Sequence, residues 1–237
     1  MTSIKSVLIS AMLQKLNERV YYGEKKHHAL GIPLGMRMAV ILLEDKSLMI
    51  YSPLPWTEDL QKAVSKLGEV SLIFAPNQFH NLGVKSCKER NPEAKVLCSP
   101  ELNKKLKGIA DIEITQEGGS LEQASEFFLE KIQGMPAVNE LVLMHKPSNT
   151  LIVADLLFYF PDSSGLMSLY AWINKIRDFP KPPILWNLAV KDKVVYKRSI
   201  NRIRGWEVDS LFLCHGKCIE TNAEHEVSQG LATVLDA

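Results

Sequence analysis

The sequence has 237 residues, of which 46% are hydrophobic and 23% are charged. This composition is typical of a globular protein that buries a sizeable core, and it excludes a disordered, fibrous or disulfide-framework chain. Because 28 basic residues nearly balance 27 acidic ones, the overall charge indicates neither a nucleic-acid nor a membrane partner. We expect one domain that covers residues 1–237.

The cellular compartment is predicted from the lack of membrane-spanning and secretion signals in the sequence and from its cysteines. No stretch is long and apolar enough to cross a bilayer, and the short apolar run from Val7 to Leu13 has no convincing signal-peptide cleavage site. The four cysteines lack the paired spacing of a structural metal site, which favours free thiols in a reducing environment. The sequence therefore predicts a cytoplasmic protein.

The predicted elements begin with a β-hairpin, in which strand-like runs at Arg37 to Leu43 and Ser47 to Ser52 flank a polar turn. Helices and strands then alternate: a helix capped by Thr57 and ending at Gly68, a strand from Val70 to Ala75, a helix from Phe79 to Arg90, a strand from Lys95 to Ser99 and a helix from Pro100 to Lys107. This order is typical of an α/β fold.

A polar, glycine-containing stretch from Gln116 to Ser120 introduces a second half. Leu141 to His145 and Thr150 to Asp155 form a second predicted hairpin, and Ser210 to Cys214 is the last predicted strand. Two halves of this kind predict two mixed sheets packed face to face, with helices outside.

Metal-capable side chains follow three of the predicted strands. His80 and Asn81 lie in the loop after Ala75, Asp155 closes the strand that begins at Thr150, and His215 follows the last strand. Because α/β folds tend to build sites at strand ends, these are the candidate functional residues.

At these positions the sequence resembles the metallo-β-lactamase fold over nearly the whole chain. The resemblance rests on three features. They are a strand, loop and helix in the first half, a later strand followed by Asp155-Leu156-Leu157-Phe158, and a final strand followed by His215-Gly216. It implies a four-layer αββα sandwich of two mixed sheets. More narrowly, an uncharacterised branch of that superfamily is similar in these segments: Arg37-Met38, Ser52-Pro53, Ala75-Pro76-Asn77 with Phe79-His80, and Ser148 to Asp155. No activity is implied by that branch.

The resemblance also implies that one of the family's two metal positions is lost. In the family motif His-x-His-x-Asp-His, Pro76 and Gln78 take the first two histidine positions, and neither replaces an imidazole. Met135 stands where the histidine between the two halves falls.

The second metal position keeps more ligands. Asp155 matches the family's bridging carboxylate and His215 its last histidine, while His80 takes the aspartate position and Asn81 the final histidine position. Two histidines and one carboxylate suit one Zn²⁺ or Fe²⁺, and Asn81 would add a carbonyl oxygen or a supporting hydrogen bond. The alternative is that these residues are structural and that no ion binds.

Three functions remain open. The first is a mononuclear metal-dependent hydrolase, in which ion-activated water attacks an ester, amide or phosphoester in a small-molecule substrate. The second is a non-catalytic binding or scaffold protein that has lost the metal site and binds a protein partner. The sequence names neither the substrate nor a catalytic residue.

The third is a nucleic-acid binder that uses residues 175–204, which hold nine basic and two acidic residues. The candidate stacking groups interleaved with this stretch are Trp172, Trp186, Tyr196 and Trp206. Core packing explains such aromatics better than base stacking does, so we expect no nucleic-acid partner. The balanced net charge gives the matching expectation of no membrane partner.

Overall fold

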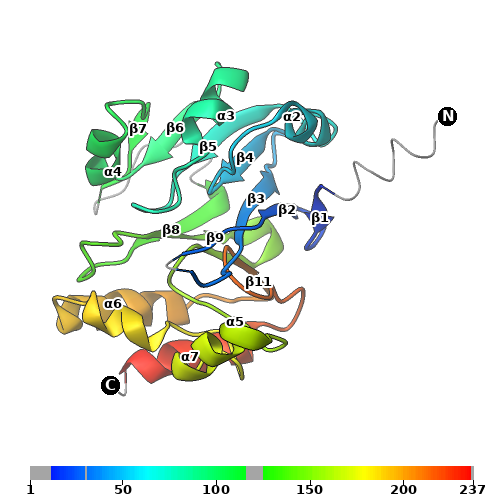
Figure 1. Ribbon diagram of the computed structural model, residues 1–237. Helices are drawn as coiled ribbons and strands as arrows, with labels where there is room; N and C mark the ends of the chain where they lie inside the picture. Colours follow the sequence, from blue (N-terminus) through cyan, green and yellow to red (C-terminus); the bar gives the residue numbers. More distant parts are fainter. Residues whose placement is uncertain (1–11, 30, 116–124, 236–237) are drawn as a thin grey trace. The chain divides into compact units, whose positions relative to one another are not determined.

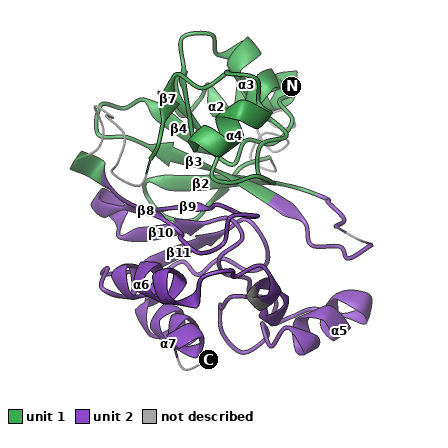
Figure 2. Cartoon of the chain, turned by 90° about the vertical axis from the view of Figure 1, so that its left-hand side faces the viewer, with its two compact units in different colours: residues 1–25, 37–126 green, residues 26–36, 127–237 purple. Residues whose placement is uncertain are grey.

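The computed structural model describes residues 12–29, 31–115 and 125–235. The chain forms two compact units, coloured separately in Figure 2. Unit 1 comprises residues 1–25 and 37–126, and unit 2 comprises residues 26–36 and 127–237. The polar stretch from Gln116 to Ser120 lies outside the described residues, and the expectation of a single domain stays a prediction.

Unit 1 is built on a mixed sheet in which the strands follow one another in sequence order from β1 to β7 (Figure 1). The strands are β1 (Gln14–Lys15), β2 (Val20–Lys25), β3 (Met36–Leu42), β4 (Leu48–Tyr51), β5 (Val70–Phe74), β6 (Lys95–Cys98) and β7 (Ile112–Glu113). The pairs β1–β2 and β3–β4 are antiparallel, whereas β4 to β7 run parallel to one another. The β3–β4 hairpin confirms the prediction, but it does not open the fold, because β1 and β2 precede it.

Three helices connect the parallel strands of unit 1: α2 (Glu58–Val64), α3 (Val84–Arg90) and α4 (Pro100–Lys105). The side chains of Thr57 and Ser99 cap α2 and α4 by accepting hydrogen bonds from backbone N–H groups in the first turn. Both helices end earlier than predicted.

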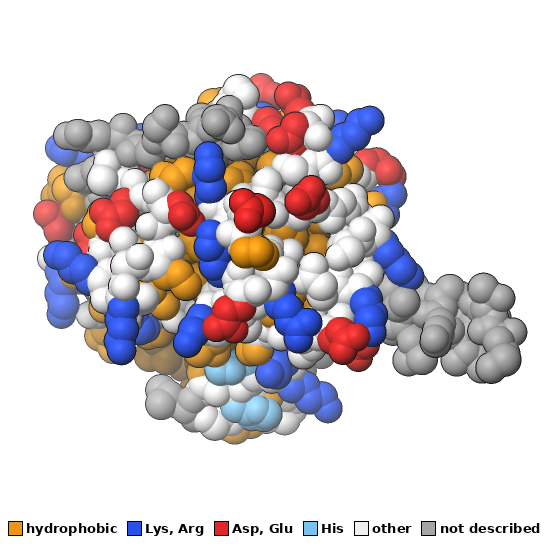
Figure 3. Space-filling view, turned by 90° about the horizontal axis from the view of Figure 1, so that it is seen from above, with side chains coloured by type: hydrophobic (Ala, Val, Ile, Leu, Met, Phe, Trp, Pro, Cys, Tyr) orange, Lys and Arg blue, Asp and Glu red, His pale blue; other side chains and the backbone are white. Residues whose placement is uncertain are grey.

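On the face shown in Figure 3, acidic and basic side chains are interspersed, as the nearly balanced charge leads one to expect.

The start of α3 differs most from the prediction, since Phe79 to Gly83 form turns instead of helix. The Asn77 side chain accepts the backbone N–H groups of Phe79 and His80, and this local bonding competes with a helix. Gly83 adds a second restraint, because a Cβ atom at that position would collide with the carbonyl groups of Pro53 and Leu54. His80 lies in this restrained segment between Phe79 and Gly83, directly before α3.

Unit 2 contains a mixed sheet in the order β11-β10-β9-β8. Its strands are β8 (Phe127–Lys131), β9 (Leu141–His145), β10 (Thr150–Val153) and β11 (Ser210–Leu213). The β9–β10 hairpin and the last strand confirm the predictions, whereas β8 was not predicted. Strand β10 runs parallel to β11, so the carboxyl ends of both strands, followed by Asp155 and His215, lie at the same edge of the sheet.

The described residues of unit 2 also form three α-helices and two 3-10 helices: η2 (Lys146–Ser148), α5 (Gly165–Ile173), η3 (Ile184–Leu188), α6 (Lys193–Arg204) and α7 (Glu224–Leu235). Helices α6 and α7 lie together on one side of the sheet in Figures 1 and 2. They close a core to which α6 contributes Tyr196 and Ile200 and α7 contributes Val227 and Leu231. None of the helices in the described part of the chain is long and apolar enough to span a membrane.

Candidate metal centre

Asp155 is held by a backbone clamp at the end of β10. The Ala154 and Asp155 N–H groups donate to the Glu140 carboxylate, at 2.8 Å to Oε1 and 3.0 Å to Oε2. The Asp155 carbonyl accepts a hydrogen bond from the Trp186 indole nitrogen at 2.8 Å. Because Glu140 is buried and directly precedes β9, the neighbouring strand fixes the backbone that carries the Asp155 side chain.

His215 is positioned by its neighbours in unit 2. Its Nδ1 atom lies 2.8 Å from the Gly35 carbonyl oxygen. A carbonyl only accepts hydrogen bonds, so Nδ1 carries the proton and Nε2 presents its lone pair when the ring is neutral. The following residue, Gly216, has a φ of 94°, and a Cβ atom there would collide with the Tyr159 carbonyl. This position therefore requires glycine, which turns the chain away immediately after the histidine.

The Nε2 atom of His215 faces Oδ1 of Asp155 at 3.5 Å, and both side chains are buried. A neutral imidazole lone pair and a carboxylate oxygen are both acceptors, and they repel each other unless a positive charge compensates. That charge is either a proton on the imidazole or a metal ion held by both groups. The structure thus brings two of the predicted ligands together in an arrangement that is able to hold a cation.

The surroundings of this pair disfavour further negative charge. Burial, followed by the charge of Asp155, raises the pKa of Glu140 to about 8, although the backbone N–H groups it accepts act in the opposite direction. Burial, with a smaller contribution from Asp155, also raises the pKa of Tyr170 to about 12. Because the carboxyl groups of Glu140 and Asp155 share a buried environment, a cation bound at Asp155 would stabilise their charged forms.

His80 is oriented in unit 1 by the same kind of contact. Its Nδ1 atom lies 2.8 Å from the Ser52 hydroxyl, and that hydroxyl donates its only proton to the Arg37 carbonyl at 3.2 Å. The imidazole must therefore donate through Nδ1, which leaves Nε2 as the ligand atom. His80 and His215 thus both have Nδ1 bound to an acceptor.

Ser52 adopts a conformation that is unusual for a residue with a side chain. Its φ is 54°, in the left-handed region, and its backbone N–H donates to the Phe74 carbonyl at 2.9 Å. Non-glycine residues held in this region cost about 1–3 kcal/mol and cluster at functional sites. The placement of a strained serine against His80 favours a functional role for the histidine.

The other residues of the predicted metal positions differ in their surroundings. The Asn81 side-chain amide donates to the Gln78 carbonyl at 2.8 Å, and its assignment as a ligand stays a prediction. Met135 is buried in the apolar core of unit 2 beside Ile132 and Val138, so this position is apolar where the family has a histidine. Sequence reasoning missed Glu140, which only its contact with the end of β10 reveals.

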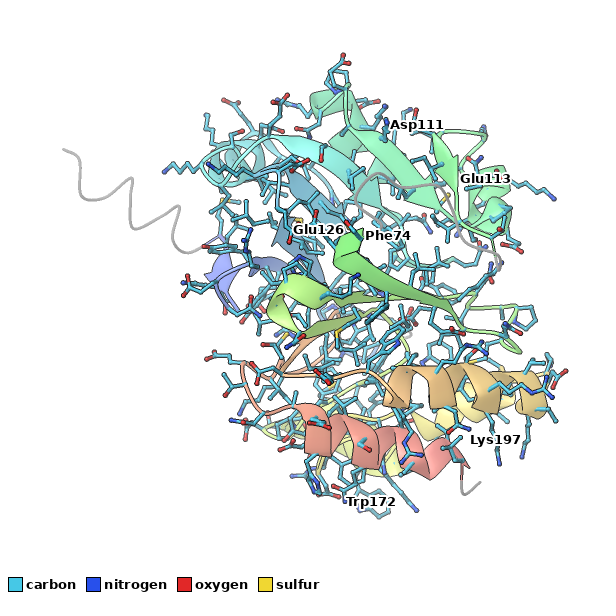
Figure 4. The ribbon with its side chains drawn as sticks, turned by 180° about the vertical axis from the view of Figure 1, so that it is seen from behind. Phe74, Asp111, Glu113, Glu126, Trp172 and Lys197 are labelled. Atoms are coloured by element: carbon cyan, nitrogen blue, oxygen red, sulfur yellow. The ribbon has the colours of Figure 1, made fainter. Side chains whose placement is uncertain are left out.

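The aromatic residues of the basic stretch mostly have structural contacts. Tyr196 is buried, Trp186 binds the Asp155 carbonyl, and Trp206 stacks on Phe128 with ring centroids 5.9 Å apart. Trp172 is the exposed member of these four, and Figure 4 shows it pointing outward. The expectation that no nucleic acid binds here stays a prediction.

Comparisons with known proteins give the fold. The family model of a domain of unknown function (DUF4336) matches residues 17–103, and no curated protein matches the sequence. A metallo-β-lactamase from Pontibacter korlensis superposes with a TM-score of 0.65 at 12% identity, covering 95% of this chain and 99% of that one. A metallo-β-lactamase from Erythrobacter litoralis gives 0.64 at 12% identity (93% and 96% covered), and the protein TMB-1 gives 0.63 at 16% identity (94% and 97% covered).

The chain has the metallo-β-lactamase fold. This confirms the predicted α/β class with two mixed sheets, and the match to an uncharacterised domain is consistent with a divergent branch. At such low identity the likeness shows the fold alone, so the chemistry must be inferred from the residues of this chain. Three residues with metal-ligating side chains, His80, Asp155 and His215, are buried at the strand ends of this metallo-β-lactamase fold.

Proposed function

We propose that the protein binds one divalent metal ion through His80, Asp155 and His215 and acts as a mononuclear metal-dependent hydrolase. The observation that carries the proposal is the buried pair of Asp155 and His215, whose acceptor atoms face each other at 3.5 Å. His80 is assigned to the same ion because the family resemblance gives it a ligand position and because Ser52 directs its Nε2 atom as Gly35 directs that of His215.

The residues present fit such an ion. Two imidazole nitrogens and one carboxylate oxygen suit Zn²⁺ or Fe²⁺ and leave coordination positions for water and substrate. A bound ion would supply Lewis acidity and lower the pKa of water toward about 7. The protein's own contribution is to fix the ligands, through the Ser52 and Gly35 contacts of the histidines and the Glu140 clamp behind Asp155.

A reducing compartment such as the cytoplasm fits this proposal. Cys87, Cys98, Cys214 and Cys218 are free thiols. Burial raises the pKa of Cys87 and Cys98 to about 12, which keeps both thiols protonated and unreactive.

The second candidate function is a binding or scaffold protein without catalysis. It is favoured by Pro76, Gln78 and Met135, which stand where the family places three histidines. Both candidates are compatible with the fold, so activity must separate them.

The test removes all metal with a chelator, adds back one equivalent of Zn²⁺ or Fe²⁺, and follows hydrolysis of ester, amide and phosphoester substrates. We expect turnover that depends on the added ion and falls at least about a hundredfold in Asp155→Ala, since one ligand is lost. Asp162→Ala is the matched control, because Asp162 is an exposed carboxylate of the same unit. A folded protein that hydrolyses none of these substrates, with or without the added ion, would support the binding function instead.

A further inference from the structure

Unit 2 exposes an apolar surface that the proposed hydrolase site does not use. Seven of the eleven exposed large hydrophobic side chains among the described residues lie between Leu166 and Leu188. Six of them form the α5–η3 surface: Leu166, Leu169, Trp172 and Ile173 on α5, and Leu185 and Leu188 on η3. Single exposed hydrophobic residues are ordinary, but a concentration of this kind marks an interaction site.

Helix α5 is apolar on both faces. Its inner face buries Met167 and Ala171 against Phe158, while the opposite face exposes the four residues named above. At 100° per residue, those four positions share an arc of about 120°, which is the width of a complete apolar stripe. The helix contains no charged residue. A helix that is apolar all round is normally covered on both sides, so the outer face requires a second apolar environment.

The 3-10 helix η3 extends the same surface. The Leu185 N–H donates to the Asn174 side chain at 3.2 Å, and Asn174 is the buried residue that ends α5. This contact places η3 directly beside the end of α5. Leu188 is 77% exposed and Trp172 is 68% exposed, which makes them the most prominent side chains of the surface. In Figure 4 Trp172 points outward.

Basic residues flank the two apolar elements in the sequence. Lys175 and Arg177 follow α5, and Lys191 and Lys193 follow η3; all four are exposed. Within the described parts of the chain, none of the ion pairs includes any of them. Of the two nearby acids, Asp192 already accepts the first backbone N–H groups of α6. Because these four basic residues outnumber the two acids, Asp178 and Asp192, the flanks carry a net positive charge that complements an external anion.

We propose that α5 and η3 dock unit 2 onto an anionic membrane surface. An uncharged helix with exposed leucines and a tryptophan suits the boundary between headgroups and acyl chains, where the indole ring is favourably placed. The flanking lysines and arginine complement anionic headgroups. The expectation of no membrane partner rested on the net charge, which does not reveal side-chain exposure. The proposal is independent of whether unit 2 holds a metal ion.

The test is sedimentation of the full chain with vesicles of phosphatidylcholine alone or of phosphatidylcholine with phosphatidylglycerol. We expect binding to the anionic vesicles that weakens as salt rises. The double variant Trp172→Glu, Leu188→Glu should bind at least about tenfold more weakly, since two apolar contacts are lost. Leu82→Glu is the control, because Leu82 is an exposed leucine of unit 1 that lies outside the proposed surface. Circular dichroism establishes that each variant is folded.

Tryptophan fluorescence gives a second readout that locates the contact. Emission should shift to shorter wavelength when anionic vesicles are added, and the shift should be absent in Trp172→Phe. Failure of the folded wild-type protein to bind anionic vesicles overturns the proposal. So does self-association without vesicles that the double variant abolishes, because the surface would then bind a second copy of the chain.

Discussion

The Nε2 atom of His215 lies 3.5 Å from Oδ1 of Asp155, and the Gly35 carbonyl holds the other ring nitrogen of that histidine. The two contacts together direct an imidazole lone pair at a buried carboxylate. This relationship arises because β10 and β11 are parallel neighbours, so their carboxyl ends meet. It links the strand register of unit 2 to the proposed binding of a cation.

The first prediction concerns Ser52. Replacing it with alanine removes the hydroxyl that orients His80, and we expect metal affinity to fall about 10–100-fold, as for other residues that orient metal ligands. Affinity is measured by competition with a coloured chelator. Ser52→Gly, which relieves the left-handed backbone but also lacks the hydroxyl, should lose the same affinity. Equal affinity in both variants and the wild type would show that the Ser52 contact does not serve a metal ligand.

The second prediction concerns the pH dependence of stability. The folded-state pKa of Glu140 is raised from 4.5 to about 8, so the folded protein binds the proton more tightly than the unfolded chain does. The resulting stabilisation is present below pH 4.5 and is lost as the pH rises through about 8. Measured with chelator present, the melting temperature should fall over this window in the wild type.

In Glu140→Gln that fall should largely disappear, because glutamine does not titrate. Glu207→Gln, at an exposed position in the same unit, should behave like the wild type. A wild-type melting temperature that rises from pH 5 to pH 8 with the same slope in Glu140→Gln would contradict the assignment.

The third prediction concerns Gly216. In Gly216→Ala the new methyl group meets the Tyr159 carbonyl in a left-handed backbone, and unfolding should require at least about 3 kcal/mol less free energy. The control is Gly108→Ala, where φ is 80° but nothing lies within 4 Å, so only backbone strain of about 1 kcal/mol is expected. Urea denaturation of both variants tests the difference. Equal losses would show that the turn after His215 is not tightly packed.

The sequence alone was sufficient to predict those helices and strands that are determined by neighbouring residues in the chain. Two apolar runs separated by a polar turn predicted the β9–β10 hairpin, and Thr57 predicted the start of α2 because its side chain caps the first turn. The three strand ends that carry His80, Asp155 and His215 followed from the same patterns together with the family resemblance.

The remainder depends on partners distant in the sequence. Glu140 and Ser52 are ordinary residues until the fold places them against Asp155 and His80. Strand β8 was missed because its sequence, Phe-Phe-Leu-Glu-Lys, neither alternates nor forms a continuous apolar run. The segment from Phe79 was predicted as helix because the side-chain bonds of Asn77 are not visible in periodicity.

The most direct test of the central claim is the metal content of protein purified without chelator or nickel resin, measured by elemental analysis for wild type, Asp155→Ala and Asp162→Ala. We predict about one equivalent of zinc or iron in the wild type and in Asp162→Ala, and none in Asp155→Ala, because removal of a carboxylate ligand opens the site. Folded wild-type protein without metal, or an Asp155→Ala variant that retains it, would contradict the proposed centre.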